Sequence, residues 1–538
     1  MSSPLKLKKL IKHTDTDQWS VEVEFQTADD PKKEARFSRK LMANSNRFLE
    51  ELLDHGAILP ANKKEAIQLI ESLNKEECPE IAEETHKGGW HGDDFVTARR
   101  TYGSGKQIKL DTNDVDAPQG LQKGTLKAYL EGIEPLAKSS RWVKVTMSTQ
   151  CTSVVSGRLN RQVRAIFHKF GDSGEGKTLG VAIALAMSGR AFKEDIPNHA
   201  ASIAGYEREL EVNRHSIAVW DELGSIENDE KFIIRHLQKL AFAFETGHGR
   251  TLAADGFGRK TRTFRWNQLG LSTAEISGRE TAKIAGVKIK PGFPRRFIDD
   301  PMQSEKNGAI CDIKIDGKLL NADERDQAIK GAKNAITENY GVALPIFVNW
   351  ILSQDDFAEQ YDTVRERFRG NFENLGGWAG EFVEVYAATA AGGVMGVRAG
   401  VIPVTEDSII NSLVTVCRNA MAYAQADKID LAGSLDKLKA AASKSGACPF
   451  LKKGEELDNA QLQECLGFKR KHDNRTILHI SLTKLTRLLG GESTVYAFVK
   501  KCKADGLMRD AKTHQALMGG KELRYYRFYW FNLFPKKK

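Results

Sequence analysis

One short stretch of the chain has the residue types and the spacing to hold a polyphosphate. Residues 171–178 read Gly-Asp-Ser-Gly-Glu-Gly-Lys-Thr and match the pattern G-x-x-x-x-G-K-[ST] at every fixed position. In this pattern a glycine-rich turn points backbone N–H groups at phosphate oxygens, the lysine reaches the β- and γ-phosphates, and the hydroxyl holds Mg²⁺. The expected ATP-binding residues are Gly171, Asp172, Ser173, Gly174, Glu175, Gly176, Lys177 and Thr178. Lys177 is the expected catalytic ammonium, and Thr178 is an expected Mg²⁺ ligand.

The segments on either side of this stretch support the same interpretation. Residues 163–170 have the apolar character of a strand, and residues 179–187 are apolar and alanine-rich, which favours a helix. The positive N-terminal end of that helix would face the phosphates. A strand, a phosphate loop and a helix are therefore expected in this order.

A pair of carboxylates follows the next apolar run. Residues 216–220 predict a short buried strand that ends in Asp221 and Glu222, 43 positions after Thr178. Carboxylates at the carboxyl end of a parallel strand lie on the ligand side of the sheet. Asp221 would hold Mg²⁺ through water, and Glu222 would polarise the attacking water. The alternative is an ordinary strand followed by a solvated acidic turn.

A third strand is expected over residues 266–273, and it ends in two hydroxyl residues. In ring ATPases a polar side chain at this point contacts the γ-phosphate or the water, and Ser272 and Thr273 are the candidates. Ser and Thr also cap helices, so a helix or turn start is the alternative.

Basic and aromatic residues are interleaved with glycines between the second and third strands. Asp255-Gly256 is a strong hairpin-turn dipeptide, and the basic side chains that follow it are Arg259, Lys260 and Arg262. Such a hairpin could project into a central channel and contact a phosphate backbone. A solvated hairpin, or pairing with protein carboxylates, is the competing interpretation.

Two adjacent arginines follow a proline- and glycine-containing turn. Arg295 and Arg296 come directly after residues 291–294. An arginine stays protonated and forms bidentate bonds, so it suits the charge on a transferring phosphoryl group. Supplied across a subunit boundary, it would make hydrolysis depend on assembly. The sequence does not choose between the two, Arg279 is a weaker candidate, and a surface ion pair is the alternative.

These elements, in this order, resemble the bacterial and phage "domain of unknown function 927" family of helicase-like ATPases. The matching pieces are residues 89–91, the phosphate loop, and residues 219–222, 271–275 and 291–297. The resemblance covers roughly residues 45–310 and implies an ATPase core related to ring helicases of mobile elements, phages or plasmids. The short spacing between the two nucleotide motifs also looks like superfamily-3 replicative helicases.

The chain departs from the family pattern in two places. Its loop reads Asp172-Ser173-Gly174-Glu175 where the family usually has Ser-Ser-Gly, but these positions are variable. No strand is evident between the phosphate-loop helix and the acidic pair, so the sheet topology of residues 188–215 is open.

Length and composition limit the class of protein. The 538 residues allow three or four domains, and 41% hydrophobic with 28% charged residues is typical of a globular chain rather than a disordered one. The net charge of +9 permits a nucleic-acid partner without requiring one. The seven cysteines are scattered and never form a C-x-x-C pair, which argues against a zinc site or disulfide framework. With no signal peptide and no apolar stretch long enough to span a bilayer, we expect a cytoplasmic protein without a membrane partner.

The predicted fold class is a multidomain α/β protein with a P-loop NTPase (RecA/AAA+-like) core. Its expected parts are an N-terminal α+β accessory domain (1–115), a helical bridge (116–162), the ATPase core (163–303), a helical lid (304–426), a flexible linker (427–455) and a winged-helix-like domain (456–538). In the last part, helices over 481–489 and 493–505 precede strands over 506–509 and 524–533. Lys500, Lys501 and Lys503 could contact DNA phosphates, although many winged helices serve protein contacts instead.

Together these features predict an ATP- and Mg²⁺-dependent helicase or translocase of a phage, plasmid or other mobile element. The expected partners are nucleic acid, either single-stranded DNA or a fork, and further copies of the chain in a ring, with a hexamer favoured. The main alternative is a regulatory or defence-associated ATPase that uses ATP as a conformational switch. A small-molecule kinase is disfavoured by the acidic pair and the C-terminal module.

Overall fold

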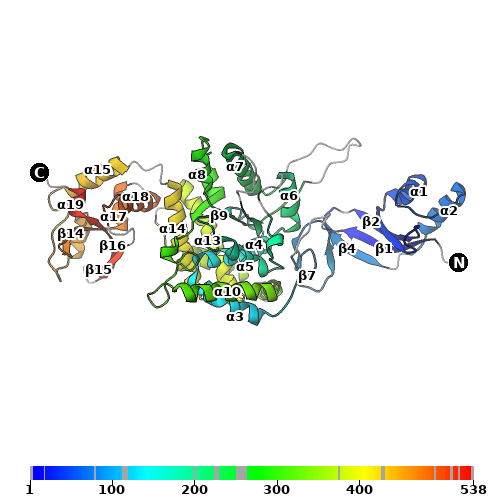
Figure 1. The fold of residues 1–538 in the computed structure, drawn as a ribbon, viewed down its shortest axis with the longest axis horizontal. Helices are drawn as coiled ribbons and strands as arrows, with labels where there is room; N and C mark the ends of the chain where they lie inside the picture. The colour runs from blue at the N-terminus through cyan, green and yellow to red at the C-terminus, as the bar shows by residue number, and fades with distance from the viewer. Residues whose placement is uncertain are drawn as a thin grey trace.

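The computed structural model describes residues 4–16, 18–77, 80–111, 119–197, 199, 203–222, 229–249, 263–373, 376–425, 431–489, 492–508, 513–518 and 521–534. Figure 1 shows an elongated molecule with an N-terminal part at one end, a central body, and a C-terminal part at the other end. Among the described residues, no helix has both the length and the apolar character needed to cross a membrane.

The N-terminal part is built on a five-stranded sheet of order β3-β2-β1-β4-β8. The first three strands pair antiparallel, whereas β4 and β8 run parallel to β1. These strands are β1 (Leu5–His13), β2 (Trp19–Phe25), β3 (Lys33–Ser38), β4 (Ile81–Thr85) and β8 (Ile108–Leu110). Two helices, α1 (Ser45–Asp54) and α2 (Lys63–Leu73), cover one face around Phe48 and Ile70. The small sheet that follows consists of β5 (Gly89–His91), β6 (Asp94–Val96) and β7 (Thr101–Tyr102).

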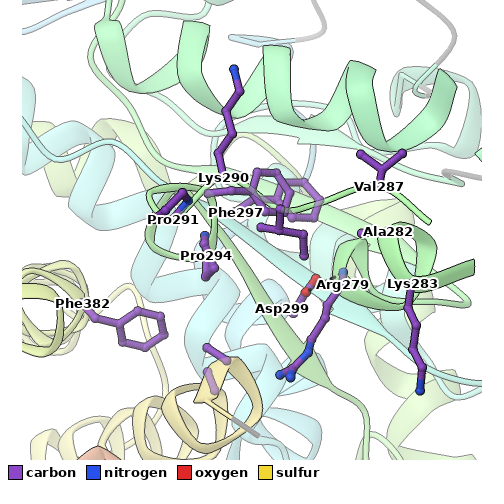
Figure 2. Close-up of a pocket in the computed structure, with 14 residues that line it drawn as sticks. Arg279, Ala282, Lys283, Val287, Lys290, Pro291, Pro294, Phe297, Asp299 and Phe382 are labelled. Atoms are coloured by element: carbon purple, nitrogen blue, oxygen red, sulfur yellow. Dashed lines mark hydrogen bonds between the residues drawn. The ribbon is translucent and has the colours of Figure 1, made fainter. Parts of the chain in front are cut away.

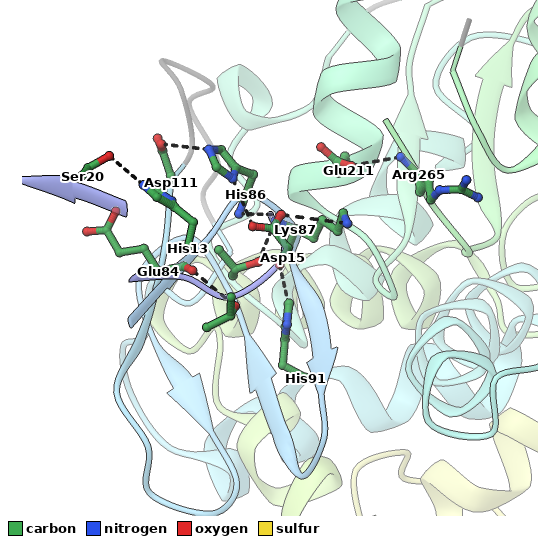
Figure 3. Close-up of polar contacts among 12 residues, drawn as sticks. His13, Asp15, Ser20, Glu84, His86, Lys87, His91, Asp111, Glu211 and Arg265 are labelled. Atoms are coloured by element: carbon green, nitrogen blue, oxygen red, sulfur yellow. Dashed lines mark hydrogen bonds and ion pairs between the residues drawn. The ribbon is translucent and has the colours of Figure 1, made fainter. Parts of the chain in front are cut away.

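Polar contacts join this N-terminal part to the central body, and Figure 3 shows the contacts around Asp15 and His86 near this junction. The Gly88 N–H donates to the Glu211 carbonyl over 3.0 Å, and Arg214 Nε donates back to the Gly88 carbonyl over 3.1 Å. Nearby, His86 Nδ1 lies 3.2 Å from Asp15 Oδ1 at the carboxyl ends of β4 and β1. Burial raises the pKa of Asp15, but the bonds from His86 and the charge of Lys87 outweigh it and lower that pKa to about 2. The two parts are therefore joined by one bond between backbone groups and by one from the Arg214 side chain.

The central body contains a four-stranded, fully parallel sheet of order β10-β11-β9-β12. Its strands are β9 (Ile166–Phe170), β10 (Ala218–Trp220), β11 (Gly270–Ala274) and β12 (Phe297–Pro301). Residues 188–215 contribute η2 (Lys193–Asp195) and α6 (Ile203–Val212), with no strand in their described part. The sheet therefore passes directly from β9 through β11 to β10, which resolves the open topology of this stretch.

Successive side chains along each strand point to opposite faces of the sheet, so the core has two layers. Phe167 and Leu271 point to one face, and Ile166 and Trp220 point to the other. The first face is covered by α4 (Arg141–Arg158), α5 (Lys177–Ala186) and α13 (Gly377–Arg398). The second is covered by α6, α7 (Glu230–Thr246), α8 (Gly278–Ile284) and α9 (Phe293–Arg296). Both faces are apolar, as parallel strands require.

Further helices complete the central body around α4 and α13 (Figure 1). They are α3 (Leu126–Ser139), α10 (Ala322–Glu338), α11 (Ala343–Leu352), α12 (Phe357–Arg369) and α14 (Glu406–Gln425). The Ser140 side chain accepts a bond from the Val143 N–H and begins α4, so the expected helical bridge is two helices joined at this residue. The bridge packs into the core, since α4 is buried along nearly its whole length.

The C-terminal part has an antiparallel sheet of order β13-β14-β16-β15, with helices on one face and a short helix, residues 459–464, against part of the other. Its elements are α15 (Leu431–Ala442), α16 (Asn459–Glu464), β13 (Phe468–His472), β14 (Arg475–Ser481), α17 (Leu482–Leu489), α18 (Glu492–Ala504), β15 (His514–Met518), β16 (Lys521–Tyr529) and α19 (Trp530–Leu533). The two helices lie where the sequence predicts them. The strand expected over 506–509 makes only one bridge, between Met508 and Phe528, and the strand expected over 524–533 divides into β16 and α19.

Close packing of α4 against α13 generates a stability prediction. A Cβ placed on Gly392 would lie 2.1 Å from Thr152 Oγ1 and 2.5 Å from Thr152 Cα. We expect Gly392→Ala to lower the free energy of unfolding by about 1–3 kcal/mol because the helices must separate. The matched control is Gly331→Ala in α10, where the new Cβ would meet nothing closer than 3.4 Å. Denaturant unfolding should show no loss for the control, and equal stability of the two variants would contradict the prediction.

Candidate nucleotide site

The glycine-rich loop joins the carboxyl end of β9 to the first turn of α5. Gly171, Gly174 and Gly176 have φ values of 153°, 82° and 90°, a region that other residues rarely adopt. A Cβ on Gly176 would lie 2.9 Å from Ile310 Cδ1, so this position is also sterically closed to a side chain. The loop thus turns tightly into a helix that begins at Lys177, and the free N–H groups of the first turn face its mouth.

The Lys177 ammonium lies across this loop. Its Nζ donates to the carbonyls of Gly171 and Asp172 over 2.9 and 2.6 Å. Burial lowers the pKa of Lys177, while the carboxylates of Glu175, Glu275 and Asp221 oppose that change. The ammonium is therefore held against the first two residues of the loop.

Three elements bring oxygen atoms together around Asp221. Thr178 Oγ1, from α5, donates to Asp221 Oδ2 and Oδ1 over 3.0 and 3.2 Å. The Thr273 hydroxyl, at the end of β11, also donates to Asp221 Oδ1. Both Asp221 and Thr273 are buried, with exposed fractions of 9% and 1%. Because β11 lies between β9 and β10, its last side chains fall between the loop and the carboxylate.

The next residue, Glu222, is exposed and has a left-handed backbone with φ of 52°. This conformation costs a non-glycine residue of order 1–3 kcal/mol and occurs most often at functional sites. Glu222 thus leaves the strand direction immediately after Asp221 and holds its carboxylate in solvent beside the site.

The two hydroxyl candidates on β11 have different surroundings. Ser272 is fully buried, with His168 Nδ1 at 2.8 Å and His199 Nε2 at 2.9 Å from its Oγ. His168 Nε2 donates to the Ile276 carbonyl over 3.1 Å, so Nδ1 accepts from Ser272, which in turn accepts from His199. Successive residues point to opposite sides of a strand, and only Thr273 contacts Asp221.

A buried ion pair lies at the end of β9, next to the loop. The sequence did not predict this pair. Lys169 Nζ lies 2.8 Å from Asp300 Oδ2, and their side chains are only 6% and 5% exposed. The Trp142 ring lies 5.4 Å from this ammonium, and its Nε1 donates to the Lys177 carbonyl over 2.8 Å. In the sequence, only the position of Lys169 within a mostly apolar strand could have indicated this pair. Asp300 could be found as its partner only once the pairing of β9 with β12 was known.

Arg295 and Arg296 lie at the opposite edge of the sheet, just before β12 begins. Arg296 Nε lies 2.6 Å from Glu245 Oε2, and Arg295 pairs with Glu381 and, at 3.7 Å, with Glu245. Since β12 and β9 are parallel, the start of β12 is a strand length away from the loop that follows β9. Neither arginine therefore lies beside the loop of its own chain.

A hollow of about 280 Å³ lies next to these arginines (Figure 2). It is lined by Phe293, Pro294 and Phe297 around the carboxyl of Asp299. Burial raises the pKa of Asp299 to about 7, although the N–H groups of Gly278 and Arg279 oppose this. Arg279 itself donates to the Tyr423 carbonyl, so this weaker finger candidate is engaged within its own chain.

Tyr423 of α14 connects the site to the C-terminal part. Its hydroxyl lies 2.6 Å from Ser277 Oγ, and its ring centroid lies 5.2 Å from that of Phe170, the residue before the loop. Lys500 of α18 lies 5.9 Å from the same ring centroid. The residue before the loop and the C-terminal helix α18 are thus separated by one aromatic ring.

The proposed basic hairpin, with Arg259, Lys260 and Arg262, lies outside the described residues. Its base is described: the Gly249 N–H donates to the Phe264 carbonyl over 2.9 Å, and His248 pairs antiparallel with Arg265. The segment therefore leaves and returns to the central body at the same place, and the role of its basic residues stays a prediction.

A family model described as "Domain of unknown function (DUF927)" matches residues 1–263. This match covers 263 of the 538 residues, just under half of the chain. The suspected family is confirmed, although the matched segment begins earlier than expected and ends before β11. The DUF927 segment thus contains the phosphate loop, Asp221 and Glu222, whereas Thr273 and both arginines follow it. No curated protein matches the chain.

Among solved structures, "SCCmec type IV Cch - active helicase" matches with a TM-score of 0.55 at 15% identity, and the match covers 98% of this chain and 94% of that one. This similarity shows a shared fold. A second structure, "The A form apo structure of NrS-1 C terminal region-CTR", matches at 10% identity over 98% of this chain and 96% of that one, with a TM-score of only 0.27.

The buried histidines of the site generate a pH prediction. Burial lowers the pKa of His168 to about 4, and it lowers that of His199 well below 6.5. Below pH 6.5 the unfolded chain takes up protons that the folded chain does not, so stability falls as the pH falls from about 6.5 toward 4. When the pH falls from 7.5 to 5.5, His168 alone should lower the free energy of unfolding by about 1.4 kcal/mol.

We expect His168→Gln to remove about this much of the pH dependence of the free energy of unfolding, measured by denaturant titration at both pH values. The exposed His55 gives the control, because His55→Gln should leave the difference between the two pH values unchanged. The same pH dependence in wild type and His168→Gln would show that His168 takes up protons equally in the folded and the unfolded chain, which would contradict the prediction.

Proposed function

We propose that this protein hydrolyses ATP and uses the energy to move along nucleic acid as a helicase or translocase of a mobile element. The observation that carries the proposal is the convergence of Lys177, Thr178, Asp221 and Thr273 on the mouth of one glycine loop. The fold shared with a solved helicase and the DUF927 segment support the same conclusion.

The oxygen atoms around Asp221 suit Mg²⁺. A hydroxyl and a carboxylate held 3.0 Å apart at the start of a helix are the hard ligands this ion uses when most of its remaining ligands are water and phosphate oxygens. The described residues hold no cluster of three or more His, Cys, Asp or Glu side chains suited to a metal, so a dedicated protein cage is not part of the proposal. When bound, Mg²⁺ would neutralise charge on the β- and γ-phosphates.

Each side chain has a separate task in this proposal. Lys177 releases the loop carbonyls and binds phosphate oxygens, and Thr178 and Asp221 hold the ion. Glu222 orients the attacking water from its exposed position next to Asp221, and Thr273 keeps the Asp221 carboxylate in place. Charge stabilisation by preorganised donors supplies most of the rate enhancement, because phosphoryl transfer needs little covalent chemistry from the protein.

The position of Arg295 and Arg296 supports a site shared between subunits. They lie at the sheet edge opposite their own loop, so they are suited to the loop of a neighbouring copy. We propose a ring, with six copies favoured, in which each subunit completes the next site. The hairpin with Arg259, Lys260 and Arg262 would then contact nucleic acid in the channel.

The first functional prediction separates binding from hydrolysis. Lys177→Ala should abolish ATP binding, because the loop loses its only ammonium, whereas Glu222→Gln should bind ATP normally and lose about 10²-fold or more in turnover. Nucleotide binding is measured with a fluorescent ATP analogue and turnover by phosphate release. Normal turnover by Lys177→Ala would place the active site elsewhere.

The second functional prediction concerns the arginines. Arg295→Ala/Arg296→Ala protein should be inactive, as should Lys177→Ala protein, but mixing the two should restore part of the ATP hydrolysis through interfaces that combine an intact loop with intact arginines. Glu245→Gln/Glu381→Gln protein is the control, since it breaks the same ion pairs and keeps both arginines. Failure of every mixing ratio to restore turnover would exclude a shared site.

A further inference from the structure

The face of the C-terminal sheet opposite α17 and α18 is only partly covered: Leu462 of α16 packs against a cluster that contains Phe468 and Tyr525. Leu478, Ile480 and Phe528 point to α17 and α18, so the residues that alternate with them point to the other face. There His479 pairs with Arg527, and Ile477 pairs with Tyr529. We call this surface the outer face of the C-terminal sheet.

The end of the outer face nearest the β13–β14 turn is hollowed. Asp473 and Asn474 form this two-residue turn with φ values of 46° and 59°, as tight hairpins require. The hollow measures about 380 Å³. Its lining residues are His472, Asp473, Arg475, Ile477, Arg527 and Tyr529.

Positive charge dominates this hollow. The Arg475 guanidinium lies 5.1 Å from the Tyr529 ring centroid, and Arg527 Nη2 lies 2.9 Å from His514 Nε2. In the part of the chain that the structure describes, Arg475 has no carboxylate partner. The one carboxylate in the lining, Asp473, lies 3.0 Å from His472 Nδ1 at the exposed turn.

The pKa of the neighbouring His479 is consistent with this positive charge. Burial lowers the pKa of His479 to about 3, and the charges of Arg527, Arg470, His514 and His472 contribute to this shift. The buried Nδ1 of His479 and Nε of Arg470 have no hydrogen-bond partner in the described structure. Arg470 donates to the Glu455 backbone carbonyl.

We infer that this hollow binds the phosphodiester backbone of nucleic acid. Two guanidinium groups on neighbouring strands, one stacked on a tyrosine, provide planar donors for phosphate oxygens, and the aromatic ring offers a surface for a base. The inference deepens and rests on the proposed function, since it assigns a place on the chain where the nucleic acid is held.

Helix α18 is the competing surface in this domain, and its surroundings disfavour it. It packs against α14 of the central body, and Lys500 points to the Tyr423 ring. A helix held between its own sheet and another domain is not free to enter a major groove. Lys501 and Lys503 remain exposed on it and provide a matched control.

The test compares two double variants of the full chain, Arg475→Ala/Arg527→Ala and Lys501→Ala/Lys503→Ala. Binding of labelled single-stranded DNA, without nucleotide, is followed by fluorescence anisotropy at several salt concentrations. We expect the arginine variant to bind on the order of tenfold more weakly than wild type. The slope of log K against log salt should also become shallower by about 1.4, because two phosphate contacts are lost and each contributes about 0.7 for a single strand. The lysine variant should match wild type.

Each other outcome overturns the inference. Equal affinity of the arginine variant and wild type, or a loss confined to the lysine variant, would move the contact elsewhere. If both arginines were needed to bind inorganic phosphate but the affinity for DNA were unchanged, the hollow would be a site for a free anion. Thermal unfolding checks the fold of both variants. Basal ATP hydrolysis, measured without DNA, separates this failure from failure of the proposed function, because neither arginine touches the nucleotide site.

Discussion

The placement of β11 between β9 and β10 is the constraint on which the candidate site depends. β11 lies between β9, which leads into the loop, and β10, which is followed by Asp221. Thr273, at the end of that strand, spans the interval by donating to Asp221, which also accepts from Thr178. The strand order therefore decides which hydroxyl joins the carboxylate, and the loop, the strands and the helix α5 act as one unit.

Burial of charge gives this unit its rigidity. Lys169 and Asp300 are almost completely removed from solvent, and an ammonium or carboxylate in such a place is stable only with its partner present. The pair links β9 to β12 at the end where the loop begins. Together with the bond from Trp142 to the Lys177 carbonyl, it holds both ends of the loop in place.

The sequence predicted the loop, its helix and the strand before Asp221, because these depend on local patterns of glycine, charge and apolar residues. It could not decide between Ser272 and Thr273, since both end the same strand, and the choice depends on which sheet face carries the loop. It missed β13 and β14 because Lys, Arg and His are interspersed among their apolar residues and hide the apolar alternation. The Lys169–Asp300 pair was beyond reach for another reason: its two members are 131 positions apart and meet only through sheet pairing.

A parallel sheet has a direction, and this has a consequence for assembly. The loop lies at the carboxyl edge and the arginines lie at the amino edge, so copies that join one edge to the other in a head-to-tail arrangement make a heterologous contact. The rotation between successive copies alone then determines the outcome: an angle that divides a full turn closes a ring, and any other angle continues as a helical filament.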